Sequence, residues 1–137
     1  MLKTGGNVAL PEKLIALYTR HILEGLNYLH NLSFFHRDIK GGNVLIQRNS
    51  EEGEAKICDF GVSKQIQDFR GKAQTCIGTT RYMAPELLEG ECQNLASADI
   101  WALGATVTEM GTGKLPFSNK ENFHGWEVSV SNSNINC

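Results

Sequence analysis

Two short segments of the sequence contain the side chains best suited to chemistry. Residues 36–43 read His-Arg-Asp-Ile-Lys-Gly-Gly-Asn, and residues 59–61 read Asp-Phe-Gly. They supply the carboxylates of Asp38 and Asp59 and the amide of Asn43, which are groups that can position a hydroxyl, take a proton or bind a hard cation. Each residue alone also has a structural interpretation, because Asp and Asn are common in turns and loop caps. Only their combination and order along the chain distinguish the chemical interpretation from the structural one.

Predicted secondary structure surrounds both segments. Apolar residues recur at steps of three and four from Leu14 to Leu29, which predicts an amphipathic helix over about 11–31. Two short apolar runs, 44–46 and 56–58, flank a polar turn and predict an antiparallel β-hairpin. The hairpin would separate the two segments and set the distance between them.

The second half of the chain adds a long loop and a second helix. Residues 60–85 show no period, and loops of this length in a small domain are usually functional. A helix is predicted from Ser97 to Met110, with Ser97 as its N-cap. Its residues, Trp101 included, are apolar nearly all round, which predicts a position in the centre of the core.

Two further motifs complete a recognisable order. Residues 83–86 read Met-Ala-Pro-Glu, and residues 99–104 read Asp-Ile-Trp-Ala-Leu-Gly. With the hairpin between the first two motifs and the loop before Met-Ala-Pro-Glu, the chain resembles the C-terminal lobe of a eukaryotic-type protein kinase over about residues 11–117. The resemblance implies a mainly α fold with a small β-hairpin and an enzyme that transfers the γ-phosphate of ATP to proteins.

The resemblance also implies roles for individual residues. Asp38 matches the catalytic aspartate that orients the attacking hydroxyl and accepts its proton, and Asn43 and Asp59 match the two Mg²⁺ ligands. Lys40 matches the lysine that serine/threonine kinases place near the transferred phosphate, where it also contacts the nucleotide. Thr79 matches the threonine that contacts the catalytic Asp and Lys. The implied cofactors are ATP and Mg²⁺, with Ser/Thr specificity, and we expect the Asp and Asn side chains to converge on one cleft.

Regulatory residues follow from the same resemblance. Arg37 is similar to the arginine that pairs with a phosphorylated loop residue in kinases switched by loop phosphorylation. Thr75, Thr79 and Thr80 are the nearby hydroxyls, and Thr75 is the predicted phosphosite because Thr79 is already assigned to the catalytic group. His36 is expected to be structural and to pack against the Asp-Phe-Gly segment.

Among kinases, the motifs look most like those of the MAP kinase kinase kinase group. Its members would act on protein substrates, including protein kinases of the next tier in a MAP kinase cascade. We therefore expect a role in signal transduction.

Composition excludes several other classes. A chain of 137 residues suits one domain, and a hydrophobic content of 41% is too high for a disordered protein. A net charge of -2 gives no reason to expect nucleic acid or a membrane surface as a partner, and no apolar run approaches the ~20 residues of a membrane span. The cysteines have neither zinc-site spacing nor a disulfide pattern. We expect a cytoplasmic protein.

The chain also departs from the complete kinase pattern. It contains no Gly-x-Gly-x-x-Gly loop and no Val-Ala-x-Lys strand, so we expect a C-terminal lobe without its N-terminal lobe. Residues 1–117 would form this partial kinase domain, and residues 118–137 an Asn- and Ser-rich, poorly ordered tail. Such a fragment is expected to be inactive alone. The alternative function is that of a catalytically inactive kinase-lobe module that binds partners or regulates an intact kinase.

Overall fold

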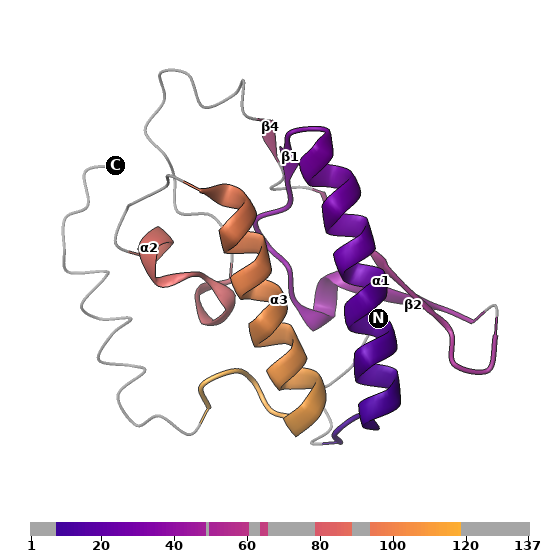
Figure 1. Ribbon diagram of the computed structural model, residues 1–137. Helices are drawn as coiled ribbons and strands as arrows, with labels where there is room; N and C mark the ends of the chain where they lie inside the picture. The colour runs from indigo at the N-terminus through magenta and orange to yellow at the C-terminus, as the bar shows by residue number, and fades with distance from the viewer. Residues whose placement is uncertain (1–7, 49, 61–63, 66–78, 89–93, 119–137) are drawn as a thin grey trace.

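The structure, a computed structural model, describes residues 8–48, 50–60, 64–65, 79–88 and 94–118. The elements in chain order are α1 (Glu12–Asn31), β1 (Phe34–Phe35), β2 (Val44–Gln47), β3 (Glu54–Ile57), β4 (Lys64–Gln65), α2 (Pro85–Leu88) and α3 (Leu95–Thr112), with short 3₁₀ turns at Gly41–Asn43 and Thr80–Tyr82. The long helices α1 and α3 lie side by side, and the β2–β3 hairpin projects beside α1 (Figure 1). Apart from Ser118, the predicted tail lies outside the described residues.

Helix α1 confirms the predicted amphipathic helix to within one residue. It begins at Glu12 because Pro11, at φ -58 and ψ 142, takes the position just before the first turn. Its buried residues are Tyr18, Ile22 and Leu26, one turn apart from each other, and they pack into the main core. This stripe is what fastens α1 to the rest of the fold.

The predicted hairpin is present in a slightly different register. β2 pairs antiparallel with β3, so that Val44 lies opposite Ile57 and Gln47 opposite Glu54. The second strand therefore ends at Ile57, not at residue 58. Gly53 precedes β3 at φ 75, where a Cβ would lie 2.7 Å from Ile46 Cγ2, so the turn needs a glycine.

The stretch 60–85 contains more structure than the long loop that was expected. β4 within it pairs antiparallel with β1, with Phe34 opposite Gln65. The 3₁₀ turn Thr80–Tyr82 and the start of α2 follow near its end. Two-residue strands and single turns have no measurable period, which is why the sequence pattern missed them.

Helix α3 confirms the second predicted helix but corrects its start. It begins at Leu95, and Asn94 is the cap because its side-chain oxygen accepts a hydrogen bond from the Ser97 N–H at 3.2 Å. Ser97 therefore lies in the first turn, and its predicted role as N-cap was wrong. The helix ends at Thr112 and is capped by Gly113, whose φ of 67 is left-handed.

The described part of α3 is not buried all round. Ala102, Leu103 and Met110 belong to the core with α1, but Ile100 and Trp101 are 47% and 43% exposed. The expectation that Trp101 lies in the core centre was therefore wrong. One face of α3 packs on α1 and β1, and these two residues occupy the other.

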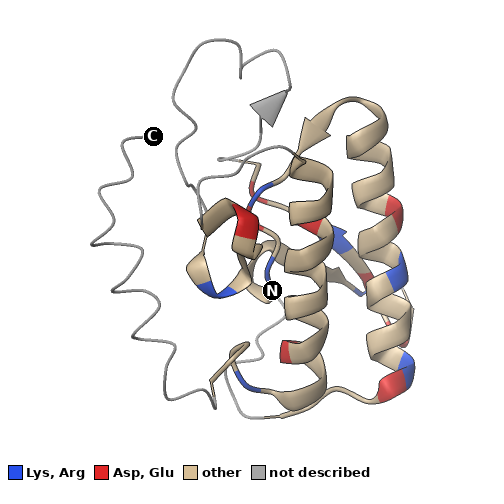
Figure 2. Ribbon diagram, turned by 60° about the vertical axis from the view of Figure 1, so that its left-hand side comes forward, with Lys and Arg blue, Asp and Glu red and all other residues tan. Residues whose placement is uncertain are grey.

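The two long helices, α1 and α3, differ clearly in their content of charged residues. α1 carries acidic and basic residues along its length, whereas α3 is almost free of charge in Figure 2. Its two acidic residues, Asp99 and Glu109, are both buried.

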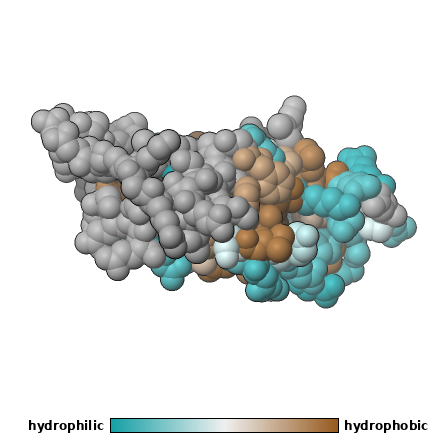
Figure 3. All heavy atoms as spheres, turned by 90° about the horizontal axis from the view of Figure 1, so that it is seen from above, coloured by the Kyte–Doolittle hydropathy of each residue, from teal (hydrophilic) through white to brown (hydrophobic). Residues whose placement is uncertain are grey.

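The face seen in Figure 3 shows a hydrophobic patch bordered by hydrophilic residues. No helix in the described ranges is both long enough and apolar enough to cross a membrane.

Candidate active site

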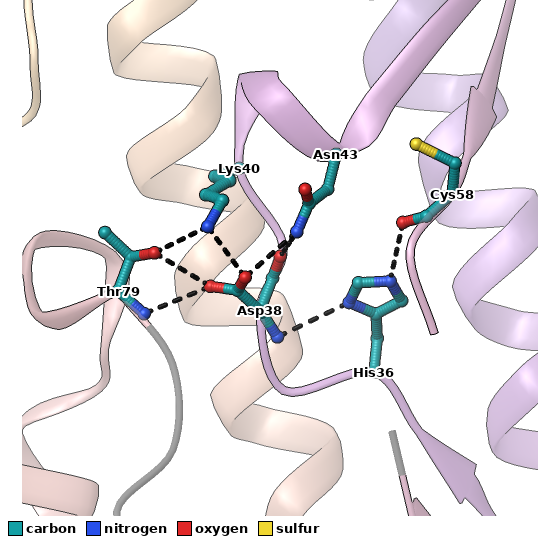
Figure 4. Close-up of polar contacts among 6 residues, drawn as sticks. All are labelled: His36, Asp38, Lys40, Asn43, Cys58 and Thr79. Carbon is teal, nitrogen blue, oxygen red and sulfur yellow. Dashed lines mark hydrogen bonds and ion pairs between the residues drawn. The ribbon is translucent and has the colours of Figure 1, made fainter. Parts of the chain in front are cut away.

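The candidate site lies where two loops meet in front of α3 (Figure 4). The first loop leaves β1, carries Asp38 and Lys40, and enters the 3₁₀ turn that holds Asn43. The second loop brings Thr79 to the start of the next 3₁₀ turn. Ile39 is fully buried between the polar residues of the first loop, and this alternation anchors the loop while its polar side chains face the site.

The Asp38 carboxylate is the centre of the site and receives four hydrogen bonds. Its Oδ1 accepts from the Thr79 backbone N–H and from the Thr79 hydroxyl, both at 3.0 Å. Its Oδ2 accepts from Lys40 Nζ at 2.7 Å and from Asn43 Nδ2 at 3.0 Å. Four predicted site residues are thereby brought into direct contact.

These contacts determine the ionisation of Asp38. Burial alone would raise the pKa of its carboxyl. The hydrogen bonds from Lys40 and Thr79, together with the positive charge of Lys40, outweigh burial and hold the pKa of Asp38 below its usual range. The group is therefore a carboxylate at neutral pH and can accept a further hydrogen bond from a hydroxyl.

Lys40 connects the two loops. Its Nζ donates to Asp38 Oδ2 and to Thr79 Oγ1, each at 2.7 Å. An ammonium group has three N–H donors, so one remains for an incoming anion. The side chain is 28% exposed, which gives a ligand access to it.

Asn43 is oriented by Asp38 and has one oxygen to offer. Its Nδ2 donates to the backbone oxygen of Asp38 at 2.7 Å as well as to the carboxylate. In Figure 4 its side-chain oxygen points away from Asp38. This oxygen is a ligand of the type that Mg²⁺ prefers.

Asp59 directly follows Cys58, whose backbone N–H is hydrogen-bonded to Asn43. The Cys58 N–H donates to the Asn43 backbone oxygen at 2.9 Å, and Asp59 is exposed with a left-handed φ of 64. Convergence of its carboxylate with Asn43 stays a prediction. No group of three or more His, Cys, Asp or Glu suited to a metal occurs among the residues described. Mg²⁺ does not require such a group, because it commonly binds one or two protein oxygens, waters and substrate phosphates.

His36 is a fully buried structural residue. Its Nδ1 accepts from the Asp38 N–H at 3.4 Å, so Nε2 carries the proton and donates to the Cys58 carbonyl at 3.2 Å. Its ring also lies edge-on to Phe60, with centroids 5.4 Å apart. His36 thus packs against the Asp-Phe-Gly segment, as expected, and links it to Asp38.

Two positioning groups were missed by the sequence analysis. Asp99 accepts from the backbone N–H groups of His36 and Arg37 at 3.0 and 2.8 Å, and its carboxylate lies 2.8 Å from His30 Nε2. Glu109 accepts from the Tyr82 hydroxyl at 2.8 Å. Acidic residues in an otherwise apolar helix are a recognisable signal, because buried charge requires partners.

Burial first, and then the bond to Glu109, raise the pKa of the Tyr82 hydroxyl, which stays protonated. The Tyr82 N–H in turn donates to the Thr79 carbonyl at 2.9 Å. α3 therefore supports both loops of the site, through Asp99 on one side and Glu109 on the other. The predicted phosphosite Thr75 lies outside the described residues.

Comparisons with known proteins show which family the sequence resembles. The family model "Protein kinase domain" matches residues 2–135. Two relatives from Homo sapiens are mitogen-activated protein kinase kinase kinase 5 and mitogen-activated protein kinase kinase kinase 6. Each is 50% identical to the chain over 107 residues, which is 77% of this chain and 8% of the relative. Serine/threonine-protein kinase dst1 of Dictyostelium discoideum is 46% identical over 110 residues, covering 80% of this chain and 14% of that relative. The chain thus spans less than a tenth of the length of the two human relatives.

Proposed function

The chain belongs to the protein kinase domain family, and from that premise we propose that it is part of a serine/threonine kinase that transfers the γ-phosphate of ATP to protein hydroxyls. The observation that carries the proposal is the Asp38 carboxylate, with Lys40, Asn43 and Thr79 all within hydrogen-bond distance of it. Phosphoryl transfer asks a protein mainly to position groups and to neutralise charge, and this cluster is suited to both.

Asp38 acts chiefly by orienting the hydroxyl. Because its pKa is lowered by Lys40 and Thr79 against the opposing effect of burial, it is a weak base. It would accept a hydrogen bond from the substrate hydroxyl and align the hydroxyl oxygen with the γ-phosphorus of ATP. As the new O–P bond forms and the bond from the γ-phosphorus to the ADP oxygen breaks, the hydroxyl proton becomes acidic and would pass to Asp38. Lys40 directs its remaining N–H at an oxygen of the transferred phosphoryl group and neutralises part of its charge.

Asn43 and Asp59 are the proposed metal-holding residues. The amide oxygen of Asn43, directed away from Asp38, and the carboxylate of Asp59 form a hard-oxygen donor set that fits Mg²⁺. When bound, the metal would neutralise charge on the nucleotide phosphates. The left-handed backbone at Asp59 is tolerated by aspartate better than by most residues.

The relatives suggest where this activity operates. Two of them are named mitogen-activated protein kinase kinase kinases. We therefore propose protein substrates that include next-tier protein kinases of a MAP kinase cascade, in the cytoplasm. Phosphorylation of Thr75, read by Arg37, is the proposed regulatory event. Residues 1–117 are the proposed catalytic segment and residues 118–137 a separate tail.

The proposal is tested by radiolabelled phosphate transfer in the full-length protein. Asp38→Asn and Asp59→Asn are expected to abolish transfer, since one loses the oriented hydroxyl and the other a metal ligand. Glu51→Gln removes an exposed carboxylate near the hairpin turn and serves as the matched control with unchanged activity. Transfer that survives Asp38→Asn would refute the assignment. Absence of transfer from the wild type, together with retained partner binding, would favour the inactive binding module instead.

A further inference from the structure

Strand β3 has two edges, and its outer edge faces α1. The Cys58 N–H donates to the Asn43 backbone oxygen, so alternate residues along β3 direct their N–H groups toward β2. The Ala55 N–H lies one residue out of this alternation and points the other way, toward α1. A helix offers no backbone acceptor on its side, because its carbonyl groups bond within the helix. The outer edge of β3 therefore depends on side chains of α1.

His21 provides the acceptor for this edge. Its Nδ1 accepts a hydrogen bond from the Ala55 N–H at 3.3 Å. Because a backbone N–H can only donate, Nδ1 is the ring nitrogen without a proton. Ala55 is only 5% exposed, so its N–H has little access to water as a replacement partner. The bond to His21 therefore fixes where β3 lies along α1.

Two further contacts extend the attachment on either side of His21. Tyr18 donates its hydroxyl to the Glu52 carbonyl, two residues before β3, and the Ile57 side chain lies against Gly25 at the end of β3. A Cβ built on Gly25 would lie 3.1 Å from Ile57 Cδ1, so the helix and the strand approach closely here. Four residues of α1 rise about 6 Å, and two residues of β3 rise about 6.6 Å. The matching rises let α1 hold β3 at successive points.

The end of β3 leads directly into the proposed metal site. Cys58 and Asp59 follow Ile57, and the Cys58 N–H bonds to the Asn43 backbone oxygen at 2.9 Å. The Asn43 side chain is held separately, by its two hydrogen bonds to Asp38. A shift of β3 along α1 would therefore move Asp59 relative to Asn43 while Asp38 keeps its place.

We propose that His21 is a positioning residue for metal binding, acting through Ala55 and β3 on Asp59. The inference rests on the proposed function, in which Asp59 and Asn43 hold Mg²⁺. Its consequence differs from that of a change near Asp38, because α3 supports that loop independently of β3. Loss of the bond from Ala55 to His21 would weaken the metal site and leave the arrangement around Asp38 intact.

The test uses two substitutions of His21 in the full-length protein. His21→Phe keeps an aromatic ring and removes the acceptor, whereas His21→Asn can place a side-chain oxygen near the position of Nδ1. His21 borders an open groove between α1 and β3, which leaves room for both side chains. The matched control is Tyr28→Phe, because Tyr28 lines the same groove from the same helix and is 67% exposed.

Two readouts are measured. Amide hydrogen exchange of Ala55, followed by mass spectrometry with fragmentation to single residues, is expected to become about tenfold faster in His21→Phe, which corresponds to the loss of one hydrogen bond. For phosphoryl transfer at fixed ATP, we expect the half-saturating Mg²⁺ concentration to rise about tenfold. We expect kcat at saturating Mg²⁺ to change less than about twofold, because excess metal refills a weakened site. His21→Asn is expected to stay within about twofold of wild type in both readouts, and Tyr28→Phe to leave both unchanged.

Every other result counts against the proposal. Wild-type exchange of Ala55 in His21→Phe would show that the bond does not hold β3, and faster exchange with an unchanged Mg²⁺ dependence would show that β3 does not position Asp59. A loss of kcat that saturating Mg²⁺ does not restore, or an equal effect of Tyr28→Phe, would indicate a general loss of folding. An effect in His21→Asn as large as in His21→Phe would exclude the acceptor as the cause.

Failure of the proposed function is a separate result. If the wild type transfers no phosphate, the proposed function fails, and binding of Mn²⁺ in the presence of ATP, titrated by electron paramagnetic resonance, decides the role of His21. An affinity about tenfold weaker in His21→Phe than in wild type would support it. Equal affinities would overturn it.

Discussion

Replacement of Thr79 by Val tests how the two loops of the site depend on each other. Valine keeps the shape of the side chain and removes the hydroxyl, which accepts from Lys40 at 2.7 Å and donates to Asp38 at 3.0 Å. The backbone bond from Thr79 N–H to Asp38 is kept. The substitution therefore removes two of the contacts that join the loops and leaves the chain path intact.

The expected decrease in kcat can be estimated from the free energy of these hydrogen bonds. A hydrogen bond to a charged group contributes about 1.5–3 kcal/mol. Lys40 and Asp38 are 28% and 14% exposed and keep their bond to each other, so water and the remaining partner recover part of the loss. We expect a net cost near 1.5 kcal/mol, which corresponds to a roughly tenfold lower kcat.

The assay compares kcat of Thr79→Val, Thr79→Ser and wild type in the full-length protein. Thr79→Ser keeps the hydroxyl and is expected to stay within about threefold of wild type. The control is Thr108→Val, because the exposed Thr108 hydroxyl bonds only along α3, to the Gly104 carbonyl at 3.1 Å. The pKa of the Asp38 carboxyl, followed by ¹³C NMR, should also rise in Thr79→Val. A kcat within twofold of wild type, or an unshifted pKa, would refute the reasoning.

The remaining predictions concern stability, completeness and regulation. Asp38→Asn should destabilise the fold at neutral pH, and because folding lowers the pKa of Asp38, its difference from wild type in urea unfolding should shrink below about pH 4. Tyr82→Phe should cost about 1–3 kcal/mol in the same unfolding assay because it removes the hydrogen bond that the Tyr82 hydroxyl donates to the buried Glu109 carboxylate, and an unchanged midpoint would contradict this. Residues 1–137 alone should transfer no phosphate, whereas a fusion with the N-terminal lobe of a relative and its later helices should; robust transfer by the short chain would disprove the dependence. Thr75→Ala should lower the activity of the phosphorylated protein, and undiminished activity would point to Thr79, Thr80 or the absence of a loop switch.

The long elements and the cluster around Asp38 could be predicted from the sequence because each carries a strong local signal. The period of α1 is set by Tyr18, Ile22 and Leu26, which all became buried. Asp38, Lys40 and Asn43 lie within six residues of each other, so a short motif already implies their proximity. Thr79 was added by family resemblance, and its contact with Asp38 and Lys40 is present in the structure.

The other features of the fold and the site depend on contacts between distant residues, which no local sequence pattern indicates. β4 is two residues long and exists through its pairing with β1. The start of α3 was misplaced because Asn94 and Ser97 are both good cap residues, and only the backbone conformation distinguishes them. His30 could be read as an ordinary helix-end residue until the structure placed Asp99 beside it.

Asp99 is far along the sequence from the residues that it contacts, and this has a consequence for folding during synthesis. Its hydrogen bonds join residues 62 to 69 positions apart. Contacts with such sequence separation form late, because the entropy of closing the intervening loop must be met first. The contacts within α1 and within the β2–β3 hairpin are local and can begin to form before α3 is made, although both elements need tertiary packing for stability. The hydrogen bonds that hold the turn at Arg37 can form only after α3 has been synthesised and has docked. A nascent chain that ends before residue 99 would contain the whole His-Arg-Asp motif and still lack the carboxylate that holds the backbone of His36 and Arg37 in place.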